Sequence, residues 1–258
     1  MPCRRLFLTP PSRPLPPSML RFLPPRLLAT TDSTQERARE AAEAGAPEGF
    51  AVQALTQTAG RGRRGRVWDS PPGNLYLSVV VRPSDGNTPI GTYSFAAALA
   101  VHAMIRAALP AVPPEDVRLK WPNDALIRGR KVAGVLGETA GEALILGFGV
   151  NRIHALAQAL FPATTLRAEA GDRKVPALES LCEDLLRHLA FWITRLRTEG
   201  FAPLRTAWNA RALTGLLTVR DSTTTLTGIS EGLAEDGRLV LRDAEGSLHH
   251  LSSGDVGG

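Results

Sequence analysis

The chain has 258 residues, 43% of them hydrophobic, so it is long enough for one large domain or for a large and a small one. No apolar run reaches the roughly 18 residues of a membrane helix, and the two cysteines form neither a metal motif nor a disulfide framework, which fits a cytoplasmic protein. The formal net charge is +5, but five of the 30 basic residues lie in residues 1 to 30, which hold no acidic residue. The other 25 basic residues are balanced by 25 acidic residues in the rest of the chain. This balance speaks against a dedicated nucleic-acid-binding domain.

Residues 1–26 are rich in proline and arginine, with the pairs Pro10-Pro11, Pro16-Pro17 and Pro24-Pro25. Proline at this density excludes a helix and favours an extended, solvated arm. No apolar stretch of adequate length follows the arginines, so the arm does not read as a secretory signal. We expect these residues to be disordered.

A helix is predicted from Ser33-Thr34 to about Ala44, with Gly45 closing it in the left-handed conformation. Ser33 and Glu36 have the spacing of a capping box. The two hydroxyls have a second interpretation as well, because amides and hydroxyls at a helix start can also bind a small ligand. A strand from Phe50 to Leu55 follows.

Residues 60–66 read Gly-Arg-Gly-Arg-Arg-Gly-Arg. Arginine is almost never buried unpaired, and repeated glycine weakens helix and strand alike, so this is predicted to be a mobile cationic loop. Glycine lets a ligand approach the backbone, and arginine offers a planar fork of donors to phosphate or carboxylate. A solvated basic loop and a nucleic-acid contact remain the alternatives at this point.

The next segments alternate between strands and helices. The β-branched run Leu75–Val81 predicts a buried strand, and the apolar spacing of residues 89–109 predicts a core helix in which His102 is structural. Further expected elements are a strand at 117–121, a hairpin joining 125–127 to 131–136, a turn at 138–142, a glycine-broken strand at 143–150, and helices at 155–160, 175–198 and 203–212. From residue 213, short strands and turns predict a small all-β module.

A second polar cluster is Lys120-Trp121-Pro122-Asn123-Asp124, followed by Lys131. Lysine is a compact charge suited to carboxylate or phosphate, although Lys131 taken alone is equally well a solvated lysine. Together with the arginine loop, the cluster suits a reaction between a carboxylate and a nucleoside triphosphate, because two anions need positive charge to approach. No standard phosphate loop is present.

These segments together resemble the biotin protein ligases, or biotin–[acetyl-CoA carboxylase] ligases. The resemblance rests on Asp32-Ser33-Thr34, Gln57, residues 60–66 with Trp68 and Ser70, residues 120–124, Lys131 with Gly134, residues 147–151, and in the last segment Gly228-Ile229 and Ser253–Val256. It implies an α+β fold. A mixed β-sheet with helices, like that of class II synthetases, would form the catalytic domain at 27–212, and an SH3-like β-barrel would follow at 213–258.

The resemblance also implies an activity. The enzyme would join biotin to ATP, giving biotinyl-5′-AMP and pyrophosphate, and then transfer biotin to a lysine of a biotin carboxyl carrier domain. ATP and Mg²⁺ would be the cofactors, and the protein would be a monomer or a homodimer. Because only the proline-rich arm precedes the catalytic region, we expect no helix-turn-helix domain and no DNA repressor activity.

The resemblance assigns roles to particular residues as well. The biotin site would comprise Ser33, Thr34, Gln35, Gln57, Gly60, Arg61, Gly62, Arg63, Lys131, Gly134, Gly147 and Gly149. The adenylate site would comprise Arg63, Trp68, Asn123, Asp124, Lys131 and Asn151. Arg61, Arg63 and Lys131 are the expected catalytic residues, and Asp124 is the one carboxylate considered for Mg²⁺. The arginine loop would close over the adenylate and shield it from water.

One position departs from the family pattern, since Gln35 stands where asparagine is usual, and its extra methylene puts one biotin contact in doubt. A lipoate- or octanoate-transferring relative would share the fold, and a nucleic-acid-binding module would use the arginine loop differently. The glycine–arginine run favours biotin over the first. The balanced charge of residues 31–258 speaks against the second.

Overall fold

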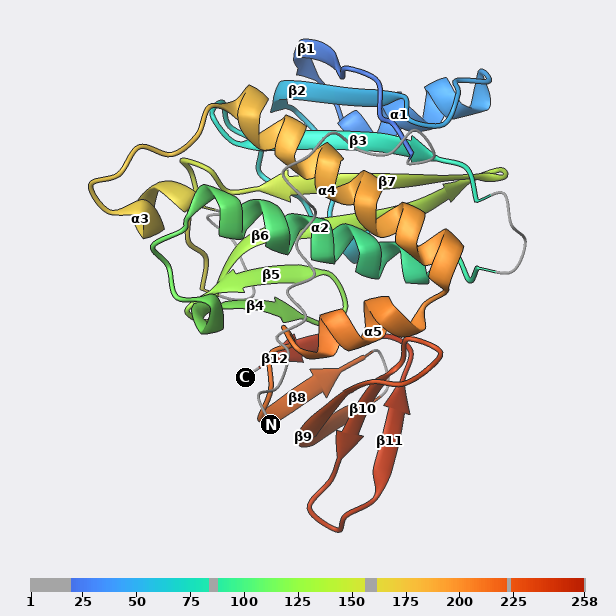
Figure 1. The fold of residues 1–258 in the computed structure, drawn as a ribbon, viewed down its shortest axis with the longest axis vertical. Helices are drawn as coiled ribbons and strands as arrows, with labels where there is room; N and C mark the ends of the chain where they lie inside the picture. Colours follow the sequence, from blue (N-terminus) through green and yellow to red (C-terminus); the bar gives the residue numbers. More distant parts are fainter. Residues whose placement is uncertain (1–19, 84–87, 156–161, 222–223, 258) are drawn as a thin grey trace, which may run out of the picture.

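The computed structural model describes residues 20–83, 88–155, 162–221 and 224–257, which form two sheets and their helices (Figure 1). The helices are α1 (Thr34–Glu43), α2 (Thr92–Ala108), α3 (Leu166–Ala170), α4 (Leu178–Glu199) and α5 (Ala202–Asn209). The large sheet consists of β1 (Arg26–Thr31), β2 (Ala51–Gln57), β3 (Leu75–Val81), β4 (Val117–Lys120), β5 (Asp124–Ile127), β6 (Arg130–Ala140) and β7 (Ala143–Val150). The small sheet consists of β8 (Leu216–Arg220), β9 (Thr225–Leu233), β10 (Leu239–Arg242), β11 (Leu248–Leu251) and β12 (Asp255–Gly257).

The large sheet is mixed, which confirms the α+β prediction. Its strand order is β1-β2-β3-β7-β6-β5-β4. β1 pairs with β2 in parallel, and the other neighbours pair antiparallel. The small sheet, with the order β11-β10-β9-β8-β12, is antiparallel throughout. No helix among the described residues is long and apolar enough to cross a membrane.

The two faces of the large sheet are covered differently. Alternation along β7 sends Leu144, Leu146 and Phe148 into a large core that also holds residues of α2 and α4, and both helices lie across this face in Figure 1. The other face packs against α1 through a smaller cluster that includes Ala38 and Ile145. Since α1 contacts mainly β2, β3 and β7, it covers only part of its face.

The small sheet shares the large core and forms no core of its own among the described residues. Leu217, Leu241 and Val256 belong to the same buried cluster as Trp121 and Trp208. The backbone is continuous across the boundary too, because Leu119 of β4 donates to Arg211 O at 2.8 Å and accepts from Leu213 N at 2.7 Å. The small sheet is therefore built onto the edge of the large one.

The structure corrects several expectations. Residues 20–26 do not continue the predicted disordered arm, because Leu20 N donates to Thr194 Oγ1 at 3.1 Å and β1 begins at Arg26. The predicted turn at 138–142 is wrong except for its last two residues, since β6 runs to Ala140 and β7 begins at Ala143. Most of the helix expected at 155–160 lies outside the described residues.

The start of α1 is as predicted, but its capping box is wrong. Ser33 is the N-cap residue, yet its side chain makes no capping hydrogen bond. Glu36 does not reach back to the cap and instead pairs with Arg39 at 2.8 Å and with Arg61 at 3.1 Å. Ser33 instead lines the cavity described next. At the other end, Gly45 takes the predicted positive φ, of 89°.

Candidate active site

A cavity of about 490 Å³ lies on the α1 side of the large sheet, within the size range of small-ligand sites. Strand alternation creates it: Gly147 and Gly149 of β7, together with Gly134 of β6, point to the face that α1 leaves open. Glycine has no side chain, so the sheet forms a shallow floor here. The arginine loop and β12 of the small sheet form other walls.

One end of the cavity is lined by neutral hydrogen-bonding groups. Gln57 Oε1 accepts from Thr34 N at 2.8 Å and from Thr34 Oγ1 at 3.1 Å, which leaves its Nε2 to donate to Ser70 Oγ at 2.9 Å. Ser78 Oγ lies 2.9 Å from Thr34 Oγ1 and donates to Gln35 Oε1 at 3.1 Å. These side chains orient one another, so this end is preorganised for a polar, uncharged group.

The longer side chain at position 35 has a structural use. Gln35 Nε2 donates to Ile145 O at 3.3 Å, so the side chain spans from the N-terminal turn of α1 to β7. A Cβ placed on Gly147 would overlap Gln35 Oε1 and lie 3.3 Å from its Cδ. Gln35 thus fills the space that Gly147 leaves open.

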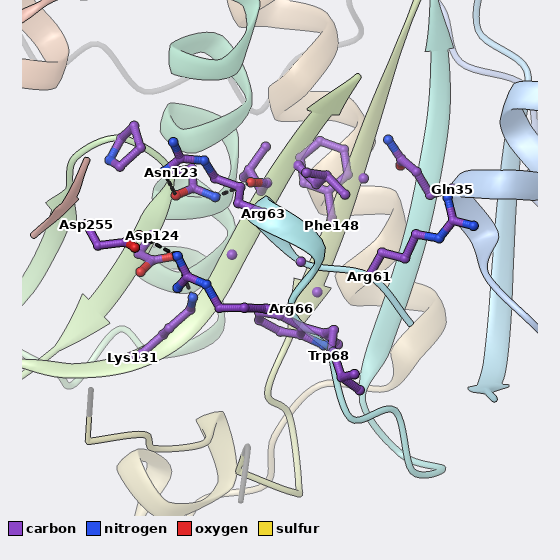
Figure 2. Close-up of a pocket in the computed structure, with 18 of the residues that line it drawn as sticks. Gln35, Arg61, Arg63, Arg66, Trp68, Asn123, Asp124, Lys131, Phe148 and Asp255 are labelled. Atoms are coloured by element: carbon purple, nitrogen blue, oxygen red, sulfur yellow. Dashed lines mark hydrogen bonds and ion pairs between the residues drawn. The ribbon is translucent and has the colours of Figure 1, made fainter. Parts of the chain in front are cut away.

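Trp68 lies on the glycine floor. A Cβ on Gly149 would fall 2.5 Å from Trp68 Cζ2, and one on Gly134 would fall 2.9 Å from Cζ3. The ammonium of Lys131 is 5.2 Å from the ring centroid, within cation–π range. The indole therefore borders the charged end, and Figure 2 shows Gln35 and Lys131 at opposite sides of the cavity.

The charged end is built around one carboxylate and two lysines. Asp124 Oδ1 is 2.6 Å from Lys131 Nζ, and Asp124 Oδ2 is 3.2 Å from Lys120 Nζ. Burial lowers the pKa of Lys120 below its ordinary value, and the charge of Asp124 only partly offsets this. Lys120 is therefore a cation held in a partly desolvated position beside Asp124.

The arginines of the loop point in different directions (Figure 2). Arg61 pairs with Glu36 of α1, and Arg63 donates to Asn123 Oδ1 at 3.5 Å. Burial lowers the pKa of Arg63, and the charges of Asp255 and Asp124 only partly oppose this. Arg64 and Arg66 pair with Asp255 of the small sheet, at 3.1 and 2.5 Å.

Six basic and two acidic side chains line the cavity, so the site has a surplus of positive charge. The basic ones are Arg61, Arg63, Arg66, Lys120, Lys131 and Arg220, and the acids are Asp124 and Asp255. Anionic groups are stabilised where several cations converge in a partly desolvated cleft. The arrangement can bring two anions together, as the sequence predicted.

Most of the predicted site residues line this cavity, and two do not. Gly60 is buried beneath the loop, where an added Cβ would lie 2.6 Å from Ser70 Oγ. Asn151 is fully buried beside β6, with Nδ2 donating to Thr164 O at 3.1 Å, and its Oδ1 has no hydrogen-bond partner among the described residues. The roles assigned to the individual residues stay predictions.

Sequence reasoning missed other lining residues. Ser78 could have been found from alternation, because it lies on the cavity face of a predicted strand. Lys120 was singled out as part of its cluster but not assigned to the site. Asp255 contributed to the resemblance as part of Ser253–Val256 but was not assigned to the site, since its partner Arg66 is 189 residues away.

The residues present do not fit a protein-bound Mg²⁺. Mg²⁺ takes carboxylate and carbonyl oxygens, but Asp124, the candidate ligand, is held by two lysines, and Asp255 by two arginines. No group of three His, Cys, Asp or Glu residues among the described parts of the chain could hold a metal ion.

Comparison with known proteins gives consistent matches along the chain. The model of the "Biotin/lipoate A/B protein ligase family" matches residues 27–151, and that of the "Biotin protein ligase C terminal domain" matches residues 218–256. The biotin–[acetyl-CoA-carboxylase] ligase of Paracoccus denitrificans is 38% identical over 232 residues, covering 85% of this chain and 95% of that protein. The corresponding ligase of Mycobacterium tuberculosis is 37% identical over 238 residues, covering 89% of this chain and 87% of its own.

A solved structure supports the same relationship at the level of the fold. The biotin protein ligase of Aquifex aeolicus in complex with biotin and ATP superposes with a TM-score of 0.78 at 28% identity, covering 90% of this chain and 97% of that one. With two family models, full-length relatives and a shared fold in agreement, the chain belongs to the biotin protein ligases.

Proposed function

We propose that this protein activates biotin with ATP to biotinyl-5′-AMP and transfers the biotin to a lysine of a carboxylase's biotin carboxyl carrier domain. The observation that carries the proposal is the single cavity that joins a neutral hydrogen-bonding end to a strongly cationic end. Such a cavity suits a molecule with a polar, uncharged head and an acyl phosphate at the other end.

The neutral end favours biotin over lipoate. The ureido group of biotin has two N–H donors and a carbonyl acceptor, which complement the hydroxyls of Thr34 and Ser78 and the amide of Gln35. The dithiolane ring of lipoate has no comparable polar atoms and could not exchange hydrogen bonds with these groups. A site built to hydrogen-bond its substrate rejects an analogue that lacks those groups by a large factor.

In the first step, a carboxylate oxygen of biotin attacks the α-phosphorus of ATP. The new O–P bond forms as the bond between the α-phosphorus and the bridging oxygen breaks, and pyrophosphate leaves with the electron pair. Lys131 and Arg63 both line the cavity, and their positive charge would reduce the repulsion between the approaching anions. We propose that Asn123 positions Arg63, to which it is hydrogen-bonded.

In the second step, the neutral amine of the acceptor lysine attacks the acyl carbon. A C–N bond forms, the bond from the acyl carbon to the phosphate oxygen breaks, AMP leaves, and the nitrogen loses one proton. The arginine loop covers the cavity in the meantime. Exclusion of water from a reactive acyl phosphate prevents its hydrolysis.

We assign the nucleotide to the charged end, with Trp68 beside it. Asn151 is fully buried outside the cavity, so its expected contact with the adenine would require the residues around it to move. The nucleotide would enter as its magnesium salt, since the protein's own carboxylates are already paired. A reaction that consumes ATP also supports a cytoplasmic location.

Nucleic-acid binding is the less favoured alternative. The loop arginines are engaged by groups of the chain itself, namely Glu36, Asn123 and Asp255. Because they are directed into or along a cavity, they do not form the open basic face that a nucleic-acid backbone requires.

Pyrophosphate release from Mg·ATP tests the proposal, with biotin and with lipoate in parallel. We expect release with biotin and little with lipoate. Arg63→Ala and Lys131→Ala should each reduce it about 10- to 100-fold, which corresponds to one charged hydrogen bond of roughly 1.5–3 kcal/mol.

Arg173→Ala and Lys174→Ala are matched controls, because both residues are exposed and lie outside the cavity. They should behave like the wild type. Release with lipoate alone would overturn the substrate, and release with neither acid would overturn the ligase assignment.

A further inference from the structure

The short strand β12 brings the small sheet into the active site. Asp255 and Val256 line the cavity although they lie at the far end of the chain from the arginine loop. The carboxylate of Asp255 contacts Arg64 at 3.1 Å and Arg66 at 2.5 Å, using a different oxygen for each. One side chain therefore bridges two arginines of the loop, as Figure 2 shows for Arg66.

The backbone hydrogen bonds of the arginine loop are mostly formed within the loop itself. Gly62 N donates to Arg66 O at 2.7 Å, and Trp68 N donates to Gly60 O at 2.9 Å. Arg64 has a φ of 56°, a left-handed conformation that is uncommon for a residue other than glycine. This conformation directs its side chain toward β12, so the ion pair stabilises an otherwise unfavourable backbone.

The strand that carries Asp255 is firmly placed. β12 pairs antiparallel with β8, with Asp255 opposite Arg220 in the strand register. Lys120 Nζ also donates to Val256 O at 3.2 Å. Gly254 has a φ of 152°, and a Cβ there would overlap Val219 Cγ1. The carboxylate therefore sits on a fixed support, and the loop is the partner that can move.

The ion pairs of Asp255 are not what holds the small sheet against the large one. The small sheet is held by its share of the apolar core, whereas partly exposed ion pairs contribute little to stability. Their local effect is larger, because Arg63, Arg64 and Arg66 repel one another within four residues. Burial opposes the ionisation of Asp255, but the hydrogen bond from Arg66 and the nearby arginine charges outweigh it and hold the pKa of Asp255 below its ordinary value.

We propose that Asp255 is a positioning residue, which latches the arginine loop over the acyl-adenylate through Arg64 and Arg66. The inference rests on the proposed function. On this account the small domain controls how long the reactive intermediate is retained. Loss of the latch would release the intermediate to water and to amines of proteins other than the carrier.

The test compares Asp255→Asn with the wild type in two assays. In the first, enzyme loaded with radiolabelled biotinyl-AMP is diluted, and loss of label from the protein and labelling of a bystander protein are followed. We expect loss about tenfold faster with Asp255→Asn and more bystander labelling. Asp255→Glu keeps the charge and should restore most of the retention.

The second assay needs no substrate and so separates failure of this inference from failure of the proposed function. Trypsin cleaves after arginine, and mass spectrometry of the fragments locates each cut. Asp255→Asn should accelerate cleavage between residues 61 and 66 without accelerating cleavage elsewhere. Glu231→Gln is the matched control, since it breaks a 2.9 Å ion pair with Arg242 of similar exposure in the same sheet.

The double substitution Arg64→Gln/Arg66→Gln provides the final check. If Asp255 acts through these arginines, Asp255→Asn should add little in that background. Independent, additive effects would contradict the latch, as would an Asp255→Asn variant that matches the wild type in retention and in cleavage. A wild type that forms no adenylate would overturn the proposed function, and unchanged cleavage would then overturn the latch as well.

Discussion

At the scale of single residues, Gln35 and Gly147 form a matched pair. The amide of Gln35 takes up the space above Gly147 and hydrogen-bonds Ser78 and Ile145 O. The departure from the family's usual asparagine is therefore accommodated within this chain. Its extra methylene lets the side chain span from α1 to β7.

Gln35→Asn should lower the free energy of unfolding by roughly 1–3 kcal/mol, because a shorter amide leaves buried polar groups unpaired. Urea titration measures this. Gly147→Ala should be costly in the wild type, where the new methyl overlaps Gln35, and less costly in the Gln35→Asn background. Strictly additive costs would contradict the pairing.

Gly149 is the second position where an absent side chain shapes the site. Gly149→Ala would place a methyl 2.5 Å from Trp68 Cζ2 and displace the indole from the cavity floor. We expect at least a tenfold loss of biotin-dependent pyrophosphate release, measured at saturating ATP, with the fold intact by circular dichroism. Gly91→Ala is the control, since a Cβ there meets nothing within 4 Å. Equal activities of Gly149→Ala and Gly91→Ala would show that activity does not depend on the absence of a side chain beneath the Trp68 ring.

At the scale of elements, the first residue before α1, Ser33, allows a stabilising role in the helix to be distinguished from a role in ligand binding. The hydroxyl of a serine N-cap usually contributes about 1 kcal/mol to stability, but Ser33 makes no such bond here and lines the cavity. Ser33→Ala should therefore change the unfolding free energy by less than about 0.5 kcal/mol, yet raise the KM for biotin. A destabilised variant with an unchanged KM would restore the capping interpretation.

The same scale shows which elements the sequence could predict. Leu75–Val81 and residues 143–150 were predictable because their apolar residues are continuous and bounded by turn residues. β12 has only three residues and no periodicity, and β1 begins directly after a proline pair. Residues 138–140 suggested a turn, but pairing with β7 keeps them extended, as with Glu138 opposite Ile145.

The candidate site was predictable to the extent that its residues are close in sequence. The local composition of the arginine loop and of the segment from Lys120 to Lys131 predicts an anionic ligand in each case. Asp255 and Ser78 become part of the cavity only through tertiary packing. Side-chain partnership across such separations is a property of the folded chain, so no local pattern encodes it.

At the scale of the whole molecule, two histidines link stability to pH. Burial, assisted by the charge of Arg211, lowers the pKa of His102 to about 3, and burial together with Arg187 lowers the pKa of His188 to about 4. The folded state therefore binds fewer protons than the unfolded state below pH 6.5. Stability contributed by the neutral rings is present above that pH and is lost as the pH falls toward the folded-state values.

Each histidine should lower the unfolding free energy by roughly 2 kcal/mol between pH 7 and pH 5. His102→Gln removes one titrating group and should flatten the fall in the urea midpoint over this range. His154→Gln is the control, because His154 is exposed. An identical pH dependence of the wild type and His102→Gln would show that His102 is not buried as a neutral ring.

The position of Trp68 at the cavity gives the protein an intrinsic fluorescence signal that reports on the site. Of the four tryptophans, Trp192 and Trp208 are at most 1% exposed and lie in the core away from the cavity, Trp121 lies in the core but also lines the cavity, and Trp68 lies at the border of the loop and the cavity. Its indole lies 5.2 Å from the Lys131 ammonium, and the residue as a whole is partly buried. Tryptophan emission responds to local polarity and nearby charge, so Trp192 and Trp208 form a constant background, and changes in emission come from the two tryptophans that line the cavity. Opening and closing of the site can therefore be followed in the unlabelled protein by fluorescence.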